Sequence, residues 1–500
     1  MSTDTQTNTE QAGAQTEEQP SVDSLLSKIN LEKPDEPISL RDAFKKESDS
    51  GKFLFALNRL IEEIGATGQK VDRLDKQLID LAISNIDKKI SAQVRTIMHQ
   101  PEFKTLEASW RGLYYAVNRT DFENIQVEII NCPKEKLKED FDEVGENIIE
   151  SGLYKQIYDQ AYNQPGASPV SYMIANYEID RKPADINFLD KTSKVCAASH
   201  CPLITSVGND FFGVKSLEEL SNESNIDAIF AQNEYMKWRS FRKAEDSKYV
   251  GLTMNRFLLR LPYDSENAPA KTFNFEEFDP EKDVEANKYL WGNPAFAFMA
   301  NVNRSFNKFG WAVNIRGPKS GGKVEDLPVH LYQSGGSTQR RLPAEMLIAE
   351  DKEYKLSENG LIPLSPYVNE DYAVFFGAHS TQAPGKNNAD AKLAANMPYL
   401  FLVSRLSHYL KVLQREEIGT TKDKNDIQNE LEKWINKLVT KASNPNEETK
   451  ARYPLRDASV SVEDNPDAPG YYQVTMNVKP HFQVEGVNID LSLVSRMPTQ

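Results

Sequence analysis

The sequence contains few of the residues that build metal sites and disulfide frameworks. Its 500 residues include three cysteines, Cys132, Cys196 and Cys201, and six histidines. So few cysteines suit a reducing compartment, where disulfides are rare. His200 precedes Cys201, but the spacing from Cys196 to Cys201 does not fit a zinc site, and no second Cys/His pair exists. We therefore expect no metal or other cofactor.

Long apolar runs and an excess of basic charge are also missing. No stretch approaches the length of a membrane span, and the N-terminus has no apolar signal-peptide core. The chain has 59 basic and 74 acidic residues, which gives a net charge of −15. An acidic chain is a poor match for a polyanion. We expect a cytoplasmic protein that does not insert into membranes and does not bind nucleic acid as its main partner.

Catalytic motifs are absent, with one near match. The sequence has neither a His-Glu-x-x-His pair nor a Gly-x-Ser-x-Gly elbow. Residues 317–323 read Gly-x4-Gly-Lys, but Val324 stands where a phosphate-binding loop needs Ser or Thr. Pro328 then prevents a long helix. We expect a flexible Gly-rich surface loop, with a nucleotide-binding enzyme as the disfavoured alternative.

Helical patterns dominate the first part of the chain. Residues 1–38 are polar and predict a disordered tail, although Val22, Leu25, Leu26 and Ile29 have the spacing of a docking helix. Apolar residues then recur at steps of three and four from Gln69 to His99. Pro101 starts a further helix, for which we expect an aromatic-rich core face.

The middle of the chain alternates between strand and helix patterns, which predicts an α/β (α+β) fold with a mixed-sheet core and flanking helices. On the helix near Trp238, Arg242 and Asp246 could form an i,i+4 ion pair. Residues 264–360 are rich in Pro and Gly and predict an inserted outer domain. The expected strands are Ile125–Ile130, Val170–Tyr177 and Pro202–Val207; the expected helices are one or two in Lys134–Tyr162, Ala184–Ser199 and one near Pro294–Phe309.

The last forty residues show three strands with strict alternation of apolar and polar side chains. A terminal strand can fold back into its own domain or pair with another chain, and the pattern leaves both possibilities open. The apolar sets are Val460 and Val462, then Tyr472, Val474, Met476 and Val478, then Val487, Ile489, Leu491 and Leu493.

An amphipathic helix is predicted just before these strands, at residues 426–442. One face is apolar and consists of Ile427, Leu431, Trp434, Ile435 and Leu438. The charged residues of the helix and of the segment before it form either a solvated face or an interface. They include Lys422, Asp423, Lys424, Asp426, Glu430 and Lys433.

The run Pro101–Leu113 closely resembles a signature of the large subunit of the type VI secretion contractile sheath, the TssC/VipB family. The resemblance covers about residues 69–498. Further matching motifs are Trp238–Arg242, Arg256–Tyr263, Leu290–Asn293, Ile315–Gly317, Leu327–His330, Ala373–Gly377, Ser404–Lys411 and Pro480–Phe482.

The resemblance implies a phage-tail-sheath-like structural protein rather than an enzyme. It implies heterodimers with a small, TssB/VipA-like subunit that polymerise around an Hcp-like inner tube, attach to a baseplate and contract to propel the tube into a target cell. A ClpV-like AAA+ ATPase would recycle the sheath, acting on this chain indirectly. The charges near residues 422–433 would face the tube, and the C-terminal strands would be shared between protomers. A cytoplasmic adaptor that does not polymerise is the alternative.

Together these features predict six segments. They are a tail (1–38), N-terminal helices and a linker that pack with the small subunit (39–120), a sheath core (121–263), the inserted outer domain (264–360), a second part of the core with the tube-facing helix (361–456), and the interlocking strands (457–500).

Overall fold

The computed structural model describes residues 76–223, 225–264, 267, 273, 275–278, 288–334, 336–384, 389–416, 423–442, 444–464 and 472–481. The polar tail with its docking helix, residue Lys422 and the last predicted strand (487–493) lie outside these residues. The chain divides into two compact units, one formed by Met1–Lys104 and Pro262–Asp283, the other by Thr105–Leu261 and Val284–Gln500.

The first unit contains the long predicted helix, whose described part is α4 (Lys76–Met98). It ends just before Pro101, where α5 (Pro101–Asn118) begins, as predicted. Among the side chains of α4 that the structure describes, only Ser91 is buried. Large apolar side chains of α4 are instead exposed, namely Leu81, Ile83, Ile86 and Ile90.

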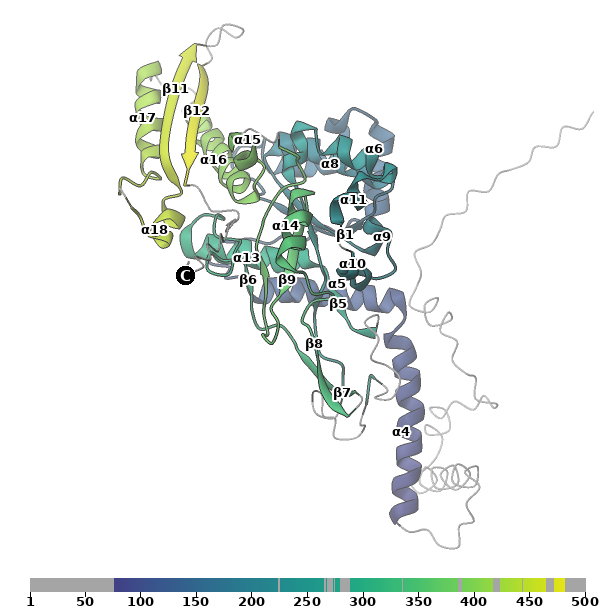
Figure 1. Cartoon of the computed structure of the whole chain (residues 1–500). Coiled ribbons are helices and arrows are strands. Elements are labelled where there is room, and N and C mark those ends of the chain that lie inside the picture. Colours follow the sequence, from purple (N-terminus) through teal and green to yellow (C-terminus); the bar gives the residue numbers. More distant parts are fainter. Residues whose placement is uncertain are drawn as a thin grey trace, which may run out of the picture. The chain divides into compact units, whose positions relative to one another are not determined.

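A six-stranded mixed sheet lies at the centre of the second unit, and Figure 1 labels its strands β1, β6 and β9. The strand order is β1-β2-β3-β9-β10-β6. Strands β1, β2, β3 and β9 are parallel, and β10 pairs antiparallel with both β9 and β6. Parallel neighbours require crossover connections, which explains why helical patterns separate the strand patterns. The strands are β1 (Met173–Ile179), β2 (Leu203–Val207), β3 (Val250–Met254), β9 (Ile362–Pro366), β10 (Ala373–Phe375) and β6 (Lys323–Val324).

Helices cover the sheet and confirm the predicted mixed-sheet core with flanking helices. The first predicted crossover helix is α8 (Pro183–Ser199), which leads from β1 to β2. The helical run predicted after Lys134 consists of α6 (Lys134–Val144), η1 (Ile148–Glu150), α7 (Gly152–Tyr154) and η2 (Lys155–Gln160). Further helices are α9 (Asn209–Phe212), α10 (Leu217–Asn222), α11 (Ile226–Ala231), η3 (Asn233–Tyr235), α12 (Met236–Phe241), η4 (Glu245–Tyr249) and α14 (Glu350–Glu358).

Helix α13 (Pro294–Phe309) lies where the sequence predicts it, and Asn293 caps its start by accepting a hydrogen bond from the Ala295 amide. Although α13 falls in the range predicted to form an outer domain, it packs against β1, β2 and β3 and most of its side chains are buried. The same range holds the hairpin β7 (His330–Ser334) and β8 (Ser337–Arg341); the side chains of residues 337–340 are exposed. The remaining short strands are β4 (Phe257–Leu258) and β5 (Trp291–Gly292).

Two local predictions are wrong. Residues 125–130 form no strand: Val127 packs against α5 and α13, while Ile129 and Ile130 are exposed without a partner ladder among the described residues. The Arg242–Asp246 pair does not form, because α12 ends at Phe241 and Arg242 turns into the core. There its guanidinium donates hydrogen bonds to the carbonyls of Glu358 and Thr381, at 2.6 and 2.9 Å.

No helix in the described part of the chain is both long enough and apolar enough to cross a membrane.

Candidate interaction surfaces

The C-terminal helices and strands form one module around the hairpin of β11 (Leu455–Asp464) and β12 (Tyr472–Pro480). The two strands are antiparallel, with Val460 opposite Met476 and Val462 opposite Val474. Figure 1 shows α17 (Lys424–Asn436) running alongside the hairpin. The other helices of this region are α15 (Ala389–Ala394), α16 (Met397–Glu416) and α18 (Glu447–Arg452).

The apolar side chains of the hairpin pack inside this module. Val460 and Val462 are buried, and they pack in one cluster with Leu431 and Ile435 of α17. The whole apolar face predicted for α17 belongs to that cluster, and so do Val474, Met476 and Val478. Tyr472, at the start of β12, is 41% exposed. The predicted apolar faces are therefore confirmed, but the hairpin side chains meet helices of their own subunit.

In the described part of the chain, most of the two backbone edges of the hairpin pair with no further strand. Within the described residues the sheet has two strands. The outer edge of β11 is covered at its first residue, where Leu455 exchanges backbone hydrogen bonds with Leu438 and Thr440. A strand edge with unpaired amide and carbonyl groups is a template for another strand. The geometry therefore suits the addition of a strand at either side.

The charges predicted to face a tube divide into two kinds. Asp423 is the N-cap of α17: its carboxylate accepts hydrogen bonds from the amides of Asn425 and Asp426, both at 2.9 Å. The Asp426 carboxylate accepts one in return from the Asp423 amide, which completes a capping box. Both residues thus have a structural role that the Asp-x-x-Asp spacing could have revealed. Glu430 and Lys433 are exposed, and Lys424 is half-exposed.

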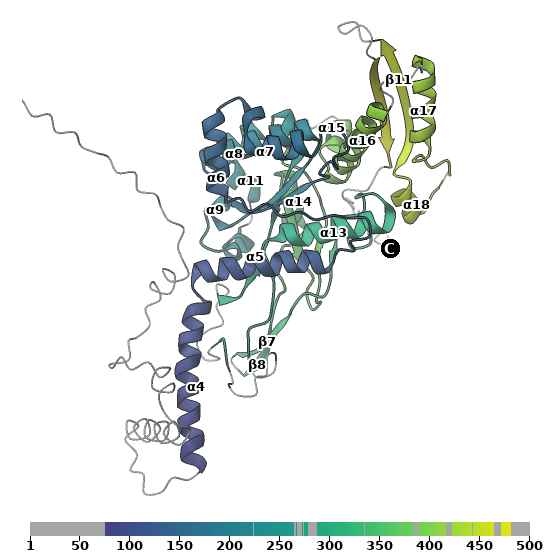
Figure 2. The same ribbon diagram turned by 180° about the vertical axis from the view of Figure 1, so that it is seen from behind.

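Helix α5 has an aromatic face that the structure leaves exposed. Its buried side carries Gly112, where a Cβ atom would lie 2.5 Å from the ring of Phe296. This close approach explains why α5 and α13 run side by side (Figures 1 and 2). The opposite side carries the α5 stripe, which consists of Leu106, Trp110 and Tyr114 with exposures of 56, 65 and 68%.

The prediction of an aromatic core face on α5 is therefore wrong for these residues. Gly112 and Ala116 are the fully buried residues of the helix, where its neighbour is closest, and Tyr115 is the aromatic residue of α5 that packs into the core, against Phe257. Helical spacing alone identifies an apolar face but does not say what covers it.

An ion-pair cluster fixes α5 beside this stripe. The Glu107 carboxylate accepts hydrogen bonds from Arg111 and from Arg260, both at 2.7 Å. Burial by itself would raise the pKa of Glu107, but hydrogen bonds and charges from the two guanidinium groups outweigh it and lower the pKa below its usual value. Glu107 is therefore held in its charged form, and it orients α5 against the strand end at Arg260.

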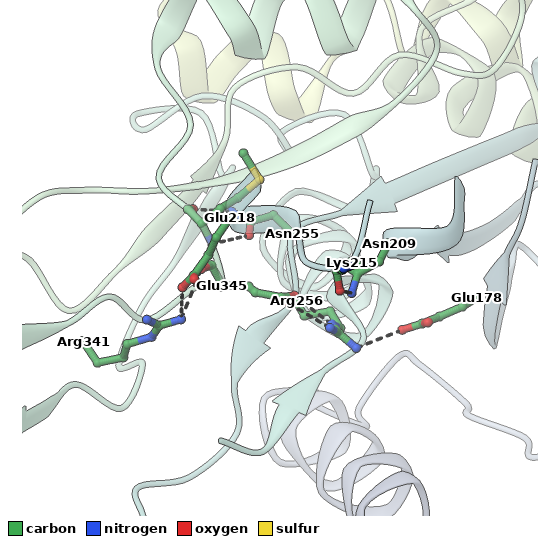
Figure 3. A network of polar contacts seen from close by, with 9 residues as sticks. Glu178, Asn209, Lys215, Glu218, Asn255, Arg256, Arg341 and Glu345 are labelled. Carbon is green, nitrogen blue, oxygen red and sulfur yellow. Dashed lines mark hydrogen bonds and ion pairs between the residues drawn. The ribbon is translucent and has the colours of Figure 1, made fainter. Parts of the chain in front are cut away.

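A polar network closes the carboxyl ends of the parallel strands (Figure 3). Arg256, just after β3, makes two hydrogen bonds of 2.8 Å with the buried Glu345 and lies 3.6 Å from Glu178 at the end of β1. Asn255 holds Met346 through two further hydrogen bonds. In open α/β sheets this is the edge where ligands are usually bound. Here ion pairs between the chain's own residues occupy it.

The Gly-rich loop at residues 317–323 does not have the geometry of a phosphate-binding loop. Lys323 begins strand β6 instead of preceding a helix, and its ammonium group pairs with Glu325 at 2.9 Å over the ring of Tyr372. Gly321 has a φ of +88°, and a Cβ there would lie 1.9 Å from a backbone oxygen. The amide of Gly317 donates to Phe375 and so ties the loop to β10. The loop is tied to the core through Gly317 and packed closely at Gly321, while Pro318 and Lys319 between them are exposed at the surface.

The cysteines lie in packed surroundings. Cys196 and Cys201 are fully buried, and burial raises the pKa of both thiols. No group of His, Cys, Asp and Glu in the described ranges has the arrangement of a metal site.

Two family models together match most of the chain. Residues 80–382 match the family described as EvpB/VC_A0108, tail sheath N-terminal domain. Residues 386–497 match the family described as EvpB/VC_A0108, tail sheath gpW/gp25-like domain. The second match spans α16, α17 and the hairpin, which the structure also groups into one module.

A curated relative also matches most of the chain. It is the type VI secretion system sheath protein TssC1 of Pseudomonas aeruginosa, 39% identical over 431 residues, which cover 84% of this chain and 86% of the relative.

Solved structures of contractile particles also align, at low similarity. A chain of the anti-feeding prophage baseplate aligns with a TM-score of 0.36 and 8% identity, covering 74% of this chain and 83% of that one. A chain of the contracted helical sheath of the same particle gives a TM-score of 0.31 and 10% identity, over 64% and 69%. Similarity at this level supports no further statement about the fold.

Proposed function

This chain belongs to the EvpB/VC_A0108 tail sheath family and is a structural subunit of a type VI secretion sheath, and we propose that it builds this sheath as a heterodimer with a small, TssB/VipA-like subunit. A sheath is a polymer, so copies of the chain assemble with one another. In our proposal the heterodimers surround an Hcp-like inner tube in the cytoplasm, stand on a baseplate and contract to propel the tube into a target cell.

The exposed apolar surface near the N-terminus supports the heterodimer. The α5 stripe places two aromatic rings in solvent on a helix whose other side is fixed to the core. Aromatic side chains are enriched at interfaces, because each buries a large area with little loss of conformational entropy. The exposed apolar residues of α4 offer a second surface of the same kind. We assign both surfaces to the small subunit.

The observation that supports the polymer is the hairpin on its helix-backed module, which has two strands among the described residues and edges that could accept another. We propose that the strand containing Val487, Ile489, Leu491 and Leu493 pairs with such an edge on a neighbouring subunit. Shared backbone pairing would hold the mesh together during contraction, because each buried group left unpaired costs about 1–3 kcal/mol. Contraction would then be a switch between two lattice states.

We propose that the outer face of α17 contacts the inner tube. Glu430 and Lys433 are exposed there, while Asp423 and Asp426 also form the helix cap. Exposed charge pairs set register and add about 0–1 kcal/mol each, which suits a contact that must release. A ClpV-like ATPase would recycle the sheath and act on this chain indirectly.

The first test is negative-stain microscopy of the chain co-expressed with its small partner. Long hollow tubes are the expected result. Discrete particles at every concentration, with the partner bound, would contradict the proposal and favour the non-polymerising adaptor.

A pair of matched variants tests the strand assignment. Leu491→Asp with Leu493→Asp places two charges on the apolar face of the proposed exchange strand, so we expect the heterodimer to persist and the tubes to disappear. Asn488→Asp with Ser492→Asp adds the same charge to the polar face and should leave tubes intact. Full-length tubes from the first variant would show that this strand does not interlock subunits.

A further inference from the structure

Residues 125–130 have the sequence pattern of a strand but no neighbouring strand in the described chain. The segment follows α5 and is neither helical nor turned. The Gln126 amide donates to the Glu128 carboxylate at 2.9 Å, a contact typical of side chains two apart on an extended strand. Among the described residues, none of the backbone amides and carbonyls of residues 125–131 has a hydrogen-bond partner. The segment therefore resembles a strand whose edges are both free within the described chain.

The segment is held in place at both ends and in the middle. The Asp121 carbonyl accepts a hydrogen bond from the Asn307 amide at 2.9 Å, and the Cys132 carbonyl accepts one from the Tyr177 hydroxyl at 2.6 Å. Between these points Val127 packs against the cluster that α5 and α13 share. A segment that is already fixed loses little conformational entropy when it gains a neighbour. The backbone is thus prepared for pairing.

The side chains of the segment lose their cover beyond Val127. Ile129 and Ile130 are 68 and 56% exposed. Adjacent residues of a strand point to opposite faces, so apolar surface is exposed on both faces here. Isoleucine fits a strand that is packed on its faces, and a free strand edge is a template for another strand. These features favour the addition of a strand from a partner.

The charges and the position of the segment indicate which partner. Asp121, Glu123 and Glu128 are exposed, and none of them forms an ion pair within the described chain. Opposite charges on neighbouring strands attract, so a basic strand is the best match. Val127 packs against the same cluster as Leu113, the residue before Tyr114 of the α5 stripe. The segment therefore continues the surface that we assign to the small subunit.

We propose that residues 125–130 pair through backbone hydrogen bonds with a strand of the small subunit. That strand carries apolar residues against Ile129 and Ile130 and a Lys or Arg beside Glu128. The pairing rests on the proposed heterodimer and adds a second contact to the α5 stripe. The strand that the sequence predicts at residues 125–130 thus forms in the complex.

Residue-resolved amide hydrogen exchange tests the pairing in the full-length chain, alone and in the discrete complex with its small partner. We expect exchange of alternate amides in residues 125–130 to slow at least about a hundredfold in the complex, because a strand paired at one edge directs every second amide to its neighbour. The same slow exchange in the chain alone would assign the edge to another part of this chain. Protection that appears only in tubes would assign it to a second copy. Either result overturns the proposal.

The same experiment separates this pairing from the heterodimer itself. A complex in which the amides of residues 125–130 exchange as fast as in the chain alone overturns the pairing and leaves the heterodimer standing. If the unmutated chain does not bind the small subunit, the heterodimer fails, and the pairing fails with it.

A pair of matched double variants tests the apolar side chains. Ile129→Lys with Ile130→Lys should keep the urea midpoint of the chain alone, because both side chains are exposed, and should weaken binding to the small subunit at least about tenfold. Ile149→Lys with Val368→Lys adds the same charge at aliphatic residues elsewhere, 54 and 59% exposed, and should bind normally. Equal affinities for the two double variants would overturn the pairing.

Charge reversal at Glu128 tests the chemistry of the partner strand. Glu128→Lys should weaken binding at least about fivefold at low salt, with a smaller effect as the salt concentration rises. Glu139→Lys, at an exposed residue of α6, is the matched control and should leave the affinity unchanged. Tighter binding by Glu128→Lys would show that the partner surface is acidic and would overturn the assigned strand.

Discussion

Arg256 shows how a single residue fills the space at the carboxyl ends of the parallel strands with an ion pair. Its guanidinium bonds Glu345 at two points, and burial, which would lower the pKa of Arg256, is outweighed by the Glu345 carboxylate, which raises it. Glu345 is almost completely buried. The pair is held in the charged form, and without Glu345 the largely buried Arg256 keeps only its longer contact with Glu178, at 3.6 Å.

Glu345→Gln should therefore destabilise the chain by about 3 kcal/mol, the usual cost of breaking a buried ion pair. Glu218→Gln is the matched control, because Glu218 also binds an arginine, Arg341, at 2.6 Å, but its side chain is 46% exposed. A surface pair contributes about 0–1 kcal/mol. Urea unfolding monitored by fluorescence measures both. Equal midpoints for the two variants would show that the Arg256 pair has no special role.

Neither this pair nor the contacts of Arg242 could have been predicted from the sequence. Arg256 and Glu345 lie 89 residues apart, and nothing local marks them as partners. For Arg242 the local rule gave a definite partner, Asp246, and it was wrong because the helix ends at Phe241, before either residue of the pair. Spacing rules hold only while the element continues. The helix cap at Asp423, by contrast, follows a local pattern that could have been predicted from the sequence.

Helix α5 has one side that packs in the fold and an opposite side that we assign to binding. Its inner side, with Gly112 and Ala116, packs on α13, and its outer side presents the α5 stripe. The inner side fixes the position of the stripe, while the stripe itself contributes little to the fold of the free chain.

Trp110→Lys with Tyr114→Lys should leave the folded chain intact, within about 0.5 kcal/mol, because both side chains are largely exposed. Binding to the small subunit should weaken at least about tenfold, as expected when aromatic anchors are removed from an interface. Interferometry with the purified partner measures the affinity. Asn118→Lys, exposed at the end of the same helix, is the control. Unchanged binding by the double variant would assign the small subunit to another surface.

The sequence predicts best those elements whose local pattern is matched by a neighbouring element in the structure. Helices α8 and α13 and strand β2 begin within a residue of the predicted positions, because capping or proline signals mark their ends. Residues 125–130 have an equally good strand pattern but lack a ladder in the described chain. Alternation shows that a segment fits a strand, and only the tertiary structure supplies the neighbour.

At the scale of the whole molecule, α16 connects the sheet domain to the C-terminal module. Met397, Leu400 and Phe401 belong to the core of the sheet domain, and Leu402 and Leu406 belong to the cluster under the hairpin. One helix thus contributes to two cores, so the two parts of the sheath subunit are packed together and not merely linked. The sequence motif at residues 404–411 marks this helix but does not reveal its double packing.

The same helix carries His408, which is buried against the end of α8. Its Nε2 atom hydrogen-bonds the carbonyl of Ser199 at 3.1 Å, and Tyr162 packs on its ring. Burial, together with the nearby Arg405, His200 and Lys411, lowers the pKa of His408 to about 4, although the hydrogen bond to Ser199 raises it. The folded chain therefore holds His408 neutral.

Acid should destabilise the packing of α16 around His408 between pH 6.5 and 4. The unfolded chain binds a proton at His408 near pH 6.5 and the folded chain only near pH 4, so stability is complete above pH 6.5 and falls by about 3 kcal/mol as the pH drops to 4. His408→Gln should flatten the dependence of the thermal midpoint on pH in this window, while Ser407→Ala should not. If His408→Gln keeps the full slope, acid acts elsewhere and α16 does not couple the two cores through this histidine.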